Sequence, residues 1–158
     1  MTDIQYKFLT EAIQLAIDNV KLGNGGPFGA IVVKDGLVVG RGVNTVTTSF
    51  DPTAHAEVNA IRDACKNLNN FQLDGCEIFS SCEPCPMCLG AIYWARPAKV
   101  YFASTKVDAA KAGFDDSFIY EEIEKDGMQR SIPFISVKHD DAIKVFEEWG
   151  MKTDKTEY

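Results

Sequence analysis

Two short runs near the middle of the chain carry side chains that could bind a metal ion. The first contains His55 and, two residues later, Glu57. The second contains Cys85 and Cys88, three residues apart, with a proline on each side of Cys85. Imidazole and thiolate groups are the usual protein ligands of Zn²⁺. The pairing of H-x-E with P-C-x-x-C therefore predicts a zinc site built by two separate segments.

Helix geometry predicts that these side chains stand at the starts of two helices. Residues two apart on a helix point about 200° away from each other, so His55 and Glu57 can share a target only beyond the first turn. Cys85 and Cys88 would lie on one face of such a turn, and Pro86 is well tolerated where a helix begins. The positive ends of two helix dipoles would then face the metal and favour thiolate over thiol.

One imidazole and two thiolates would balance the charge of Zn²⁺ and leave its fourth position open. Three protein ligands are typical of catalytic zinc, whereas structural zinc normally has four. Such a zinc ion lowers the pKa of a bound water to about 7. Glu57 could take the proton of that water, pass it to a ring nitrogen and later protonate a departing amine. H-x-E with P-C-x-x-C is also the signature of zinc-dependent nucleobase deaminases.

Each part of this pattern has a simpler interpretation. A C-x-x-C alone also occurs in redox-active sites and in structural zinc sites, and a lone histidine on a helix is more often structural than a ligand. Cys82 could supply a fourth ligand and close the site, although at the end of a strand it would face the core. A closed site would indicate a zinc-stabilised binding domain that unfolds on chelation.

Apolar residues at helical spacing predict the helices that surround this site. The first would begin at Asp3 and the second at Thr53, both residue types that cap helices. The third, over residues 86–95, is almost wholly apolar, which implies burial on most of its sides. The last, over residues 140–151, would turn Ile143, Phe146 and Trp149 inward. The predicted helices cover residues 3–22, 53–68, 86–95, 117–125 and 140–151.

Short apolar runs bounded by turn residues predict the strands. Asp35-Gly36 is a two-residue hairpin signal between the first two of them. Strands that alternate with helices favour a mostly parallel sheet with helices on both faces, and 158 residues suffice for one such domain. The predicted strands cover residues 28–33, 37–43, 76–81 and 100–103, with a further extended segment over 133–138.

The composition is ordinary for a globular protein but acidic in its balance. Hydrophobic residues make up 46% and charged residues 25%. A net charge of −7 argues against a protein that follows nucleic-acid phosphates, and no apolar run approaches the length of a membrane span. Five cysteines, an odd number, do not suggest a secreted disulfide framework. We expect a cytoplasmic protein that acts without nucleic acid or membrane.

With these motifs the chain resembles the cytidine deaminase-like superfamily and, within it, the small bacterial-type guanine deaminases. The two metal-binding motifs mark the superfamily, whereas the segment FDDSF (114–118) and the terminal Tyr158 narrow the resemblance to the second group. The resemblance covers most of the chain from Gly25 to Tyr120. Other matching stretches are GGPFGA (25–30), DPTAHAE (51–57) and CEPCPMCLGAIYWARP (82–97).

The resemblance implies a three-layer α/β/α sandwich with a five-stranded mixed sheet, and hydrolytic deamination of guanine to xanthine and ammonia. It assigns one Zn²⁺ per chain to His55, Cys85 and Cys88, and proton transfer to Glu57. It also implies a single domain over 1–158 and a homodimer that exchanges C-terminal segments, here about residues 135–158. Six residues would contact the purine: Phe28, Asn44, Ala56, Trp94, Asp116 and Tyr158.

Other substrates and simpler roles for these residues stay open at this point. A tRNA adenosine deaminase shares both motifs, although the acidic balance argues against it. Triazines, guanosine and cytosine are further aminated compounds that such a site could accept. Phe28 and Trp94 could be core aromatics, Asn44 a turn residue and Asp116 a helix N-cap, and Tyr158 could be an ordinary frayed terminus.

Overall fold

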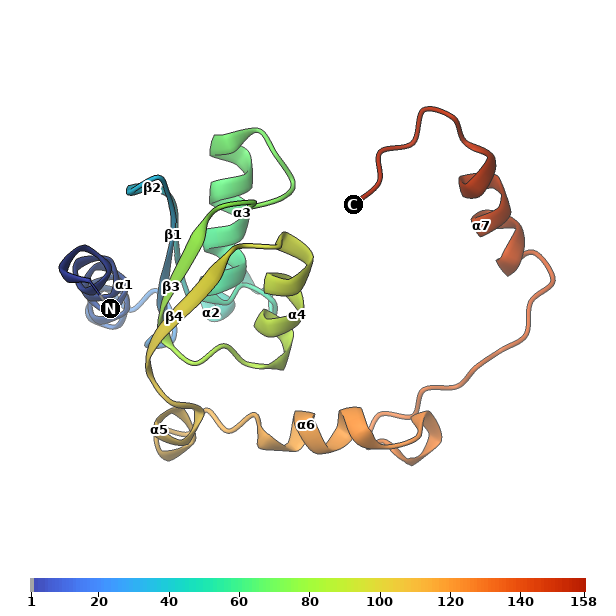
Figure 1. The fold of residues 1–158 in the computed structure, drawn as a ribbon. Coiled ribbons are helices and arrows are strands. Elements are labelled where there is room, and N and C mark those ends of the chain that lie inside the picture. Colours follow the sequence, from blue (N-terminus) through green and yellow to red (C-terminus); the bar gives the residue numbers. More distant parts are fainter. Residues whose placement is uncertain (1) are drawn as a thin grey trace. The chain divides into compact units, whose positions relative to one another are not determined.

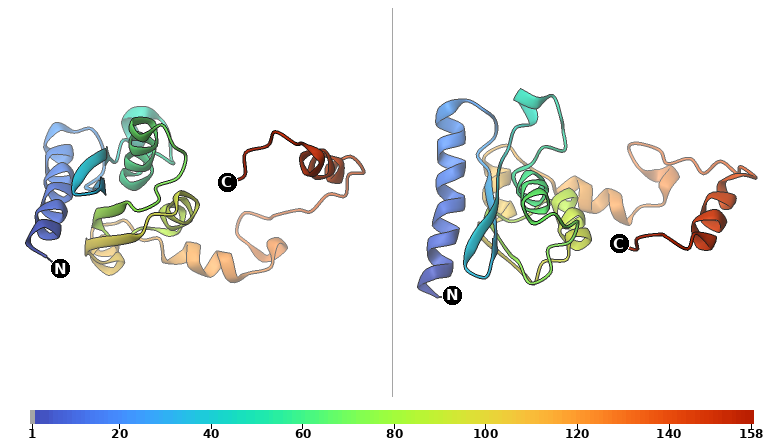
Figure 2. Two further views of the ribbon diagram at one scale, coloured as in Figure 1. Left: turned by 45° about the horizontal axis from the view of Figure 1, so that its top comes forward. Right: turned by 90° about the horizontal axis from the view of Figure 1, so that it is seen from above.

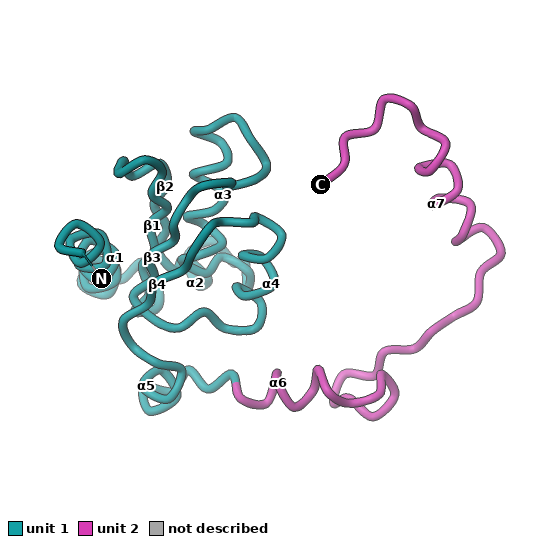
Figure 3. Tube along the Cα trace, viewed as in Figure 1, with its two compact units in different colours: residues 1–116 teal, residues 117–158 magenta. Residues whose placement is uncertain are grey.

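The computed structural model of the chain describes residues 2–158, which divide into two compact units (Figure 3). The first unit ends at Asp116 and the second runs from Ser117 to Tyr158. The first carries the β-sheet and the metal-binding motifs. The second has no strand among its residues 117–158 and consists of α6 (Ser117–Glu124), the 3₁₀ turn η1 (Gly127–Gln129) and α7 (Ala142–Met151), joined by irregular segments.

A four-stranded sheet of order β2-β1-β3-β4 forms the centre of the first unit. β1 (Gly29–Lys34) pairs antiparallel with β2 (Leu37–Val43) and with β3 (Glu77–Cys82), and β3 pairs parallel with β4 (Lys99–Ser104). The prediction of a mixed sheet is therefore confirmed. The prediction of a mostly parallel sheet was wrong, because the hairpin and the β1–β3 pair are both antiparallel.

The sheet has four strands and not five, because residues 133–138 join no ladder. A strand needs a neighbour for its backbone N–H and C=O groups, and the second unit offers none among residues 117–158. Phe134, Ile135 and Val137 of this segment are all exposed.

The hairpin turn is as predicted: Asp35 and Gly36 both have positive φ, 51° and 77°, as a type I′ turn requires.

Helices cover both faces of the sheet, as the sandwich architecture implies (Figures 1 and 2). α1 (Asp3–Leu22) packs on one face, whereas α3 (Ala56–Leu68) and α4 (Pro86–Ala95) pack on the other. Successive strand residues point to opposite faces, so β1 contributes to two apolar cores. The core under α1 contains Leu9, Ala12, Ile31, Val33 and Phe79; the core under α3 and α4 contains Ala30, Val32, Ala56, Ala60, Ala64, Ile78 and Ile92.

The helix starts differ from two of the predicted caps. Thr2, not Asp3, caps α1: its hydroxyl accepts a bond from the Gln5 amide while the Gln5 side chain accepts one from Thr2 N. α3 begins after His55 and not at Thr53. The amide and hydroxyl of Thr53 instead both donate to the carboxylate of Asp51, at 2.8 and 2.7 Å.

Two short helices are additions to the predicted elements. α2 (Val46–Ser49) is a single turn after β2, and α5 (Lys106–Lys111) follows β4. In α5 the Thr105 and Asp108 side chains form a capping box, which stabilises a helix start. No helix within residues 2–158 combines the length and the apolar character that a membrane crossing demands.

Two predictions of burial were wrong for the chain as described. α4 buries Cys88, Ile92 and Ala95 but leaves Tyr93 and Trp94 exposed, at 75% and 64% of their surface. The second unit likewise leaves an apolar set uncovered, because Ile143, Phe146 and Trp149 of α7 are 61%, 71% and 43% exposed. The apolar character of these helices is therefore not explained by the core of the single chain.

Candidate active site

The metal-binding motifs meet where α3 and α4 begin. His55 is the N-cap residue of α3 and Cys85 that of α4, and both have extended backbones with ψ of 158° and 169°. Neither side chain caps its own helix. An N-cap side chain that leaves its helix start can reach across to another group, which is why both residues are available as ligands.

The three predicted ligands form a compact group. Nδ1 of His55 lies 3.5 Å from Sγ of Cys85 and 3.5 Å from Sγ of Cys88, and the three donor atoms all lie within 4.8 Å of one another. Donor atoms placed about 2.0–2.3 Å from a tetrahedral zinc ion would be separated by roughly 3.3–3.8 Å. One imidazole and two sulfurs at this spacing therefore fit Zn²⁺.

The electrostatics of the group favour a thiolate at neutral pH. A bond from the Cys88 thiol, together with the His55 imidazole, lowers the pKa of Cys85 to about 4 against the opposing effect of burial. The bond to the Cys85 sulfur and burial raise the pKa of Cys88. Interaction with Cys85 also raises the pKa of His55. One thiolate is thus present before a metal binds, and binding would release the proton of the other.

Glu57 stands beside this group without belonging to it. Its carboxylate is buried, accepts a bond from the Ser80 hydroxyl at 3.3 Å and faces the Cys88 thiol at 3.4 Å. Burial raises the pKa of the Glu57 carboxyl. A carboxyl group whose pKa is raised toward neutrality is suited to accept and return a proton at neutral pH.

Cys82 does not close the metal site. It ends β3, its thiol lies 3.6 Å from the Thr105 carbonyl oxygen, and it is outside the group of three ligands. Burial raises the pKa of Cys82 to about 11, so its sulfur is a thiol at neutral pH. The described residues 2–158 therefore provide three ligands at this position, and a zinc ion held by them would keep a fourth position for water.

A cavity of about 900 Å³ opens beside the ligands within the first unit. His55, Cys85 and Glu57 form part of its wall. Three of the residues predicted to contact a purine line it as well: Phe28, Asn44 and Asp116. Burial raises the pKa of the half-buried Asp116 carboxyl.

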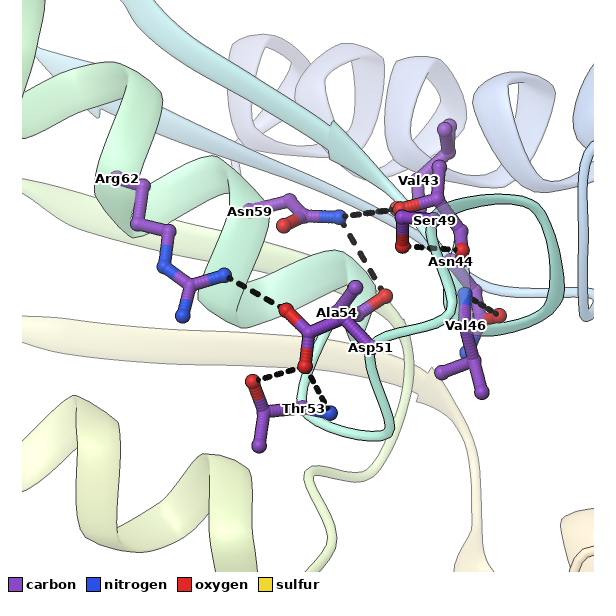
Figure 4. A network of polar contacts seen from close by, with 10 residues as sticks. Val43, Asn44, Val46, Ser49, Asp51, Thr53, Ala54, Asn59 and Arg62 are labelled. Carbon is purple, nitrogen blue, oxygen red and sulfur yellow. Dashed lines mark hydrogen bonds and ion pairs between the residues drawn. The ribbon is translucent and has the colours of Figure 1, made fainter.

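Asn44 presents one hydrogen-bond donor that the fold does not use. Its Oδ1 accepts bonds from the amides of Gly26 at 3.1 Å and Val46 at 3.3 Å, the second of which is visible in Figure 4. Two N–H donors aimed at one atom identify it as the oxygen of the carboxamide. Within residues 2–158 no group accepts a bond from Nδ2. The amide nitrogen can therefore donate to a ligand in the cavity.

Three predicted contact residues are not among those that line the cavity. Ala56 is fully buried in the first turn of α3, between a ligand and Glu57. Trp94 is on the exposed side of α4, and Tyr158 belongs to the second unit, where it is 69% exposed. The structure thus brings Phe28, Asn44 and Asp116 together with His55, Cys85 and Glu57 around the cavity, whereas Ala56 and Trp94 of the same unit do not line it.

The cavity also contains residues that sequence reasoning missed. Phe114 lies edge-on against Phe28, with ring centroids 5.0 Å apart and an angle of 86° between the rings. Its place in the FDDSF segment was the signal that could have found it. Glu83 and Lys106 line the cavity too, and the carboxylate of Glu83 accepts a bond from the Lys106 amide at 2.9 Å. Glu83 lies in the matching stretch 82–97, whereas Lys106 has no distinctive sequence pattern.

Comparison with known proteins agrees with this geometry. The family of the cytidine and deoxycytidylate deaminase zinc-binding region matches residues 2–104. The guanine deaminase of Bacillus subtilis (strain 168) is 57% identical over 151 residues, which cover 96% of this chain and 97% of that protein. The tRNA-specific adenosine deaminase of the same organism is 34% identical over 115 residues, covering 73% and 71%.

Two solved structures show the same arrangement at different levels of likeness. The X-ray structure of guanine deaminase from Bacillus subtilis has a TM-score of 0.96 at 55% identity, covering 100% of this chain and 99% of that one. Guanine deaminase from Nitrosomonas europaea has a TM-score of 0.65 at 33% identity, covering 69% and 63%. The first likeness extends over both units of the chain.

Proposed function

Since the chain belongs to the family of the cytidine and deoxycytidylate deaminase zinc-binding region, we propose that it hydrolyses guanine to xanthine and ammonia. One observation carries the proposal: a chain that matches a guanine deaminase over nearly its whole length also holds a three-ligand metal group, a buried carboxyl and an unused amide donor around one cavity. The acidic net charge of −7 favours a small purine over RNA.

His55, Cys85 and Cys88 would hold one Zn²⁺ per chain. When bound, zinc supplies a nucleophile at neutral pH by lowering the pKa of a water to about 7. In the overall reaction water adds its oxygen to C2 of guanine, and the bond from C2 to the exocyclic nitrogen breaks. The protein must therefore move two protons, one to a ring nitrogen and one to the leaving ammonia.

Glu57 is the group that we assign to this transfer. Its carboxylate accepts a bond from Ser80 and contacts a ligand sulfur, so it would lie beside a metal ion that this sulfur held. It takes one proton from the water and gives it to a ring nitrogen, then takes the remaining proton from the oxygen added at C2 and delivers it to the leaving amine. The raised pKa of Glu57 suits a group that both accepts and returns protons.

The residues on the cavity wall would orient the ring. Nδ2 of Asn44 can donate to an acceptor on the purine edge, and Asp116 can accept from its N–H groups. Phe28, held edge-on by Phe114, offers an apolar surface to the ring. We assign the same binding role to Ala56 through its backbone and to Trp94 and Tyr158, on the strength of the family resemblance.

We further propose that residues 1–158 act as a single deaminase domain in a cytoplasmic homodimer, with a segment of about 135–158 exchanged between subunits. The support is apolar surface that the single chain leaves open: Ile135, Val137 and Phe146 are 69%, 79% and 71% exposed. Five free cysteines, two of them metal ligands, need a reducing compartment to stay functional.

Ammonia release from guanine, measured with the zinc content of the same sample, tests this function. The expected result is turnover with about one zinc per chain, since three protein ligands suffice for a catalytic ion. Zinc without release from guanine would overturn the substrate assignment, and adenosine in tRNA, guanosine, cytosine and triazines would be tested next. Sedimentation of the full chain tests the dimer, and a monomer at micromolar concentration would contradict it.

A further inference from the structure

Asn44 lines the cavity, and every one of its polar groups except Nδ2 is bonded within the described residues. Its backbone N donates to the Phe28 carbonyl at 3.1 Å, and its backbone O accepts from Nδ2 of Asn19 at 2.8 Å. Its Oδ1 accepts from the amides of Gly26 and Val46. Because these bonds fix both the backbone and Oδ1 of Asn44, Nδ2 is held in one orientation. A binding group held in place before its ligand arrives is what preorganised binding requires.

The side chain of Asn59, on α3, holds the residues on both sides of Asn44. Its Nδ2 lies 2.9 Å from the carbonyl oxygen of Val43 and 3.2 Å from Oγ1 of Thr45. The same nitrogen lies 3.4 Å from the carbonyl oxygen of Ala54. Figure 4 shows Asn59 between these segments, with its bonds to Val43 and Ala54 drawn.

Asn59 thereby ties the segment that carries Asn44 to the segment that carries a metal ligand. Ala54 directly precedes His55, and the Thr45 amide also donates to the Ala54 carbonyl, at 3.0 Å. The amide of Asn59 donates to the His55 carbonyl at 2.9 Å, so the side chain projects from the first turn of the helix that begins at the ligand. One carboxamide thus sets the spacing between the two parts of the site.

A second asparagine on the same helix makes a comparable bond away from the site. Nδ2 of Asn67 donates to the Val39 carbonyl at 2.9 Å and so anchors the far end of α3 to β2. Asn67 and Val39 do not line the cavity. The same helix therefore carries a purely structural anchor at Asn67 and the arrangement around Asn59. Substituting each asparagine in turn distinguishes a structural role from a role in the site.

We infer that Asn59 is a positioning residue that orients Asn44 toward the purine, an inference that rests on the guanine deaminase function proposed above. Asn59 does not touch the substrate. It acts through the backbone on each side of Asn44 and keeps the free Nδ2 donor at a fixed distance from the metal ligands. Asn19, from α1 on the other side of the chain segment, completes the restraint by holding the Asn44 carbonyl.

The test is a double-mutant cycle of Asn59→Ala and Asn44→Ala on the full chain, with Asn67→Ala as the matched control. kcat and KM for guanine, zinc content and melting temperature are measured for each protein. Asn59→Asp, which keeps the shape of the side chain and loses its donor hydrogens, is measured alongside. Hydrogen exchange of the Gly26 and Val46 amides, both bound to Oδ1 of Asn44, provides a readout that needs no turnover.

We expect Asn59→Ala to lower kcat/KM for guanine by about 10- to 100-fold, mainly through KM, because small misplacements of binding groups have effects of this size. Asn59→Asp should behave alike, whereas Asn67→Ala should stay within about twofold of the unmutated chain. In the Asn44→Ala background, Asn59→Ala should lower kcat/KM by less than about threefold, since the effects of substituting interacting residues are not additive. Zinc content should be unchanged, and both amides should exchange faster.

Three results would overturn the inference. The first is equal loss of kcat/KM in Asn59→Ala and Asn67→Ala, and the second is full additivity with Asn44→Ala. The third is unchanged exchange of the Gly26 and Val46 amides in Asn59→Ala. If the unmutated chain does not release ammonia from guanine, the proposed function fails, and the amide measurement alone still decides whether Asn59 positions Asn44.

Discussion

Sγ of Cys88 lies 3.4 Å from a carboxylate oxygen of Glu57, although the two residues come from different helices. A metal ligand and the carboxyl group proposed for proton transfer are therefore in direct contact. The contact is possible because α3 and α4 begin at the same point and each contributes residues from its first turn. The fold thus places the ligand group and the Glu57 carboxyl in one small volume.

The first prediction concerns the carboxyl group itself. Glu57→Gln keeps the shape of the side chain and its contact with Ser80, so zinc content and melting temperature should change little. Turnover should fall by about 100-fold or more, because loss of general acid–base catalysis has effects of this size. Steady-state ammonia release and zinc analysis on the same sample measure both quantities. Turnover near that of the unmutated chain would remove Glu57 from the mechanism.

The second prediction concerns removal of the metal. A chelator should abolish turnover and leave Cys85 as the most reactive thiol, because neighbouring groups lower the pKa of Cys85 to about 4 and it is only half-buried. Cys82, whose pKa burial raises to about 11, should stay unmodified at pH 7 and serves as the internal control. Iodoacetamide labelling followed by peptide mass analysis measures the relative labelling rates of the cysteines. Zinc should protect Cys85, and faster labelling of Cys82 would contradict the assignment.

Much of the site was predictable because its signals are local. The order His55, Glu57, Cys85, Cys88 places ligands at helix starts by simple geometry, and the structure confirms the ligand group. α4 was predicted with its observed bounds, since Pro86 marks its first turn. The start of α3 was harder to predict, because Thr53 is a residue type that often caps helices. Only the structure shows that Thr53 bonds to Asp51 instead.

What the sequence could not reveal depends on contacts between distant segments. The apolar character of α4 predicted burial on most of its sides, but Cys88, Ile92 and Ala95 are buried and Tyr93 and Trp94 are exposed. The resemblance implied five strands and residues 133–138 were predicted to be extended, yet strand pairing needs a neighbour that local patterns do not supply. Asn19 and Asn59 are ordinary helix residues in the sequence, and only the fold brings their amides to the Asn44 segment.

The third prediction concerns acid stability of the second unit. The Glu122 carboxylate bonds Lys125 at 2.5 Å and accepts the amide and hydroxyl of Ser131 at 2.6 and 2.9 Å; Lys125 first and then Ser131 lower the pKa of Glu122 to about 2. A lowered pKa means that these contacts stabilise the fold above pH 4.5, the ordinary value for glutamate, and that the stabilisation is lost as pH falls toward 2.

An NMR titration of the Ser131 amide measures this directly. Its midpoint should lie well below pH 4, and Lys125→Met should move it upward, because Lys125 is the largest cause of the shift. Lys144→Met, which removes a lysine bonded to Asp141 elsewhere in the unit, is the control and should leave the midpoint in place. A midpoint near 4.5 in the unmutated chain would contradict the prediction.

The fourth prediction concerns the C-terminal residue. If Tyr158 contacts the purine as the family resemblance implies, removing it should raise KM for guanine several-fold with little change in melting temperature, since the residue is 69% exposed. Tyr6→Ala provides a control, because Tyr6 is an exposed tyrosine near the other end of the chain. Unchanged kinetics after removal of Tyr158 would make it an ordinary terminal residue.

The fifth prediction concerns Gly40 and Gly42, the two glycines of β2 against which α3 packs. A Cβ at Gly42 would overlap the carbonyl oxygen of Ala56, in the first turn of α3, and the backbone nitrogen of Ala60. A Cβ at Gly40 would overlap the carbonyl oxygen of Ala60 and the residue Ala64, farther along the helix. Both Gly→Ala changes should destabilise the fold by about 1–3 kcal/mol, the usual effect of overpacking. Only Gly42→Ala displaces the helix start that carries His55 and Glu57.

We therefore expect Gly42→Ala to weaken zinc binding and to lower kcat, and Gly40→Ala to lower only the free energy of unfolding. Zinc affinity by competition with a chelator, urea unfolding and ammonia release distinguish the two variants. Equal zinc affinity in both would mean that α3 tilts as a rigid body or that the ligands adjust independently of its first turn. A selective loss in Gly42→Ala would establish that close packing of α3 on β2 sets the position of the metal ligand.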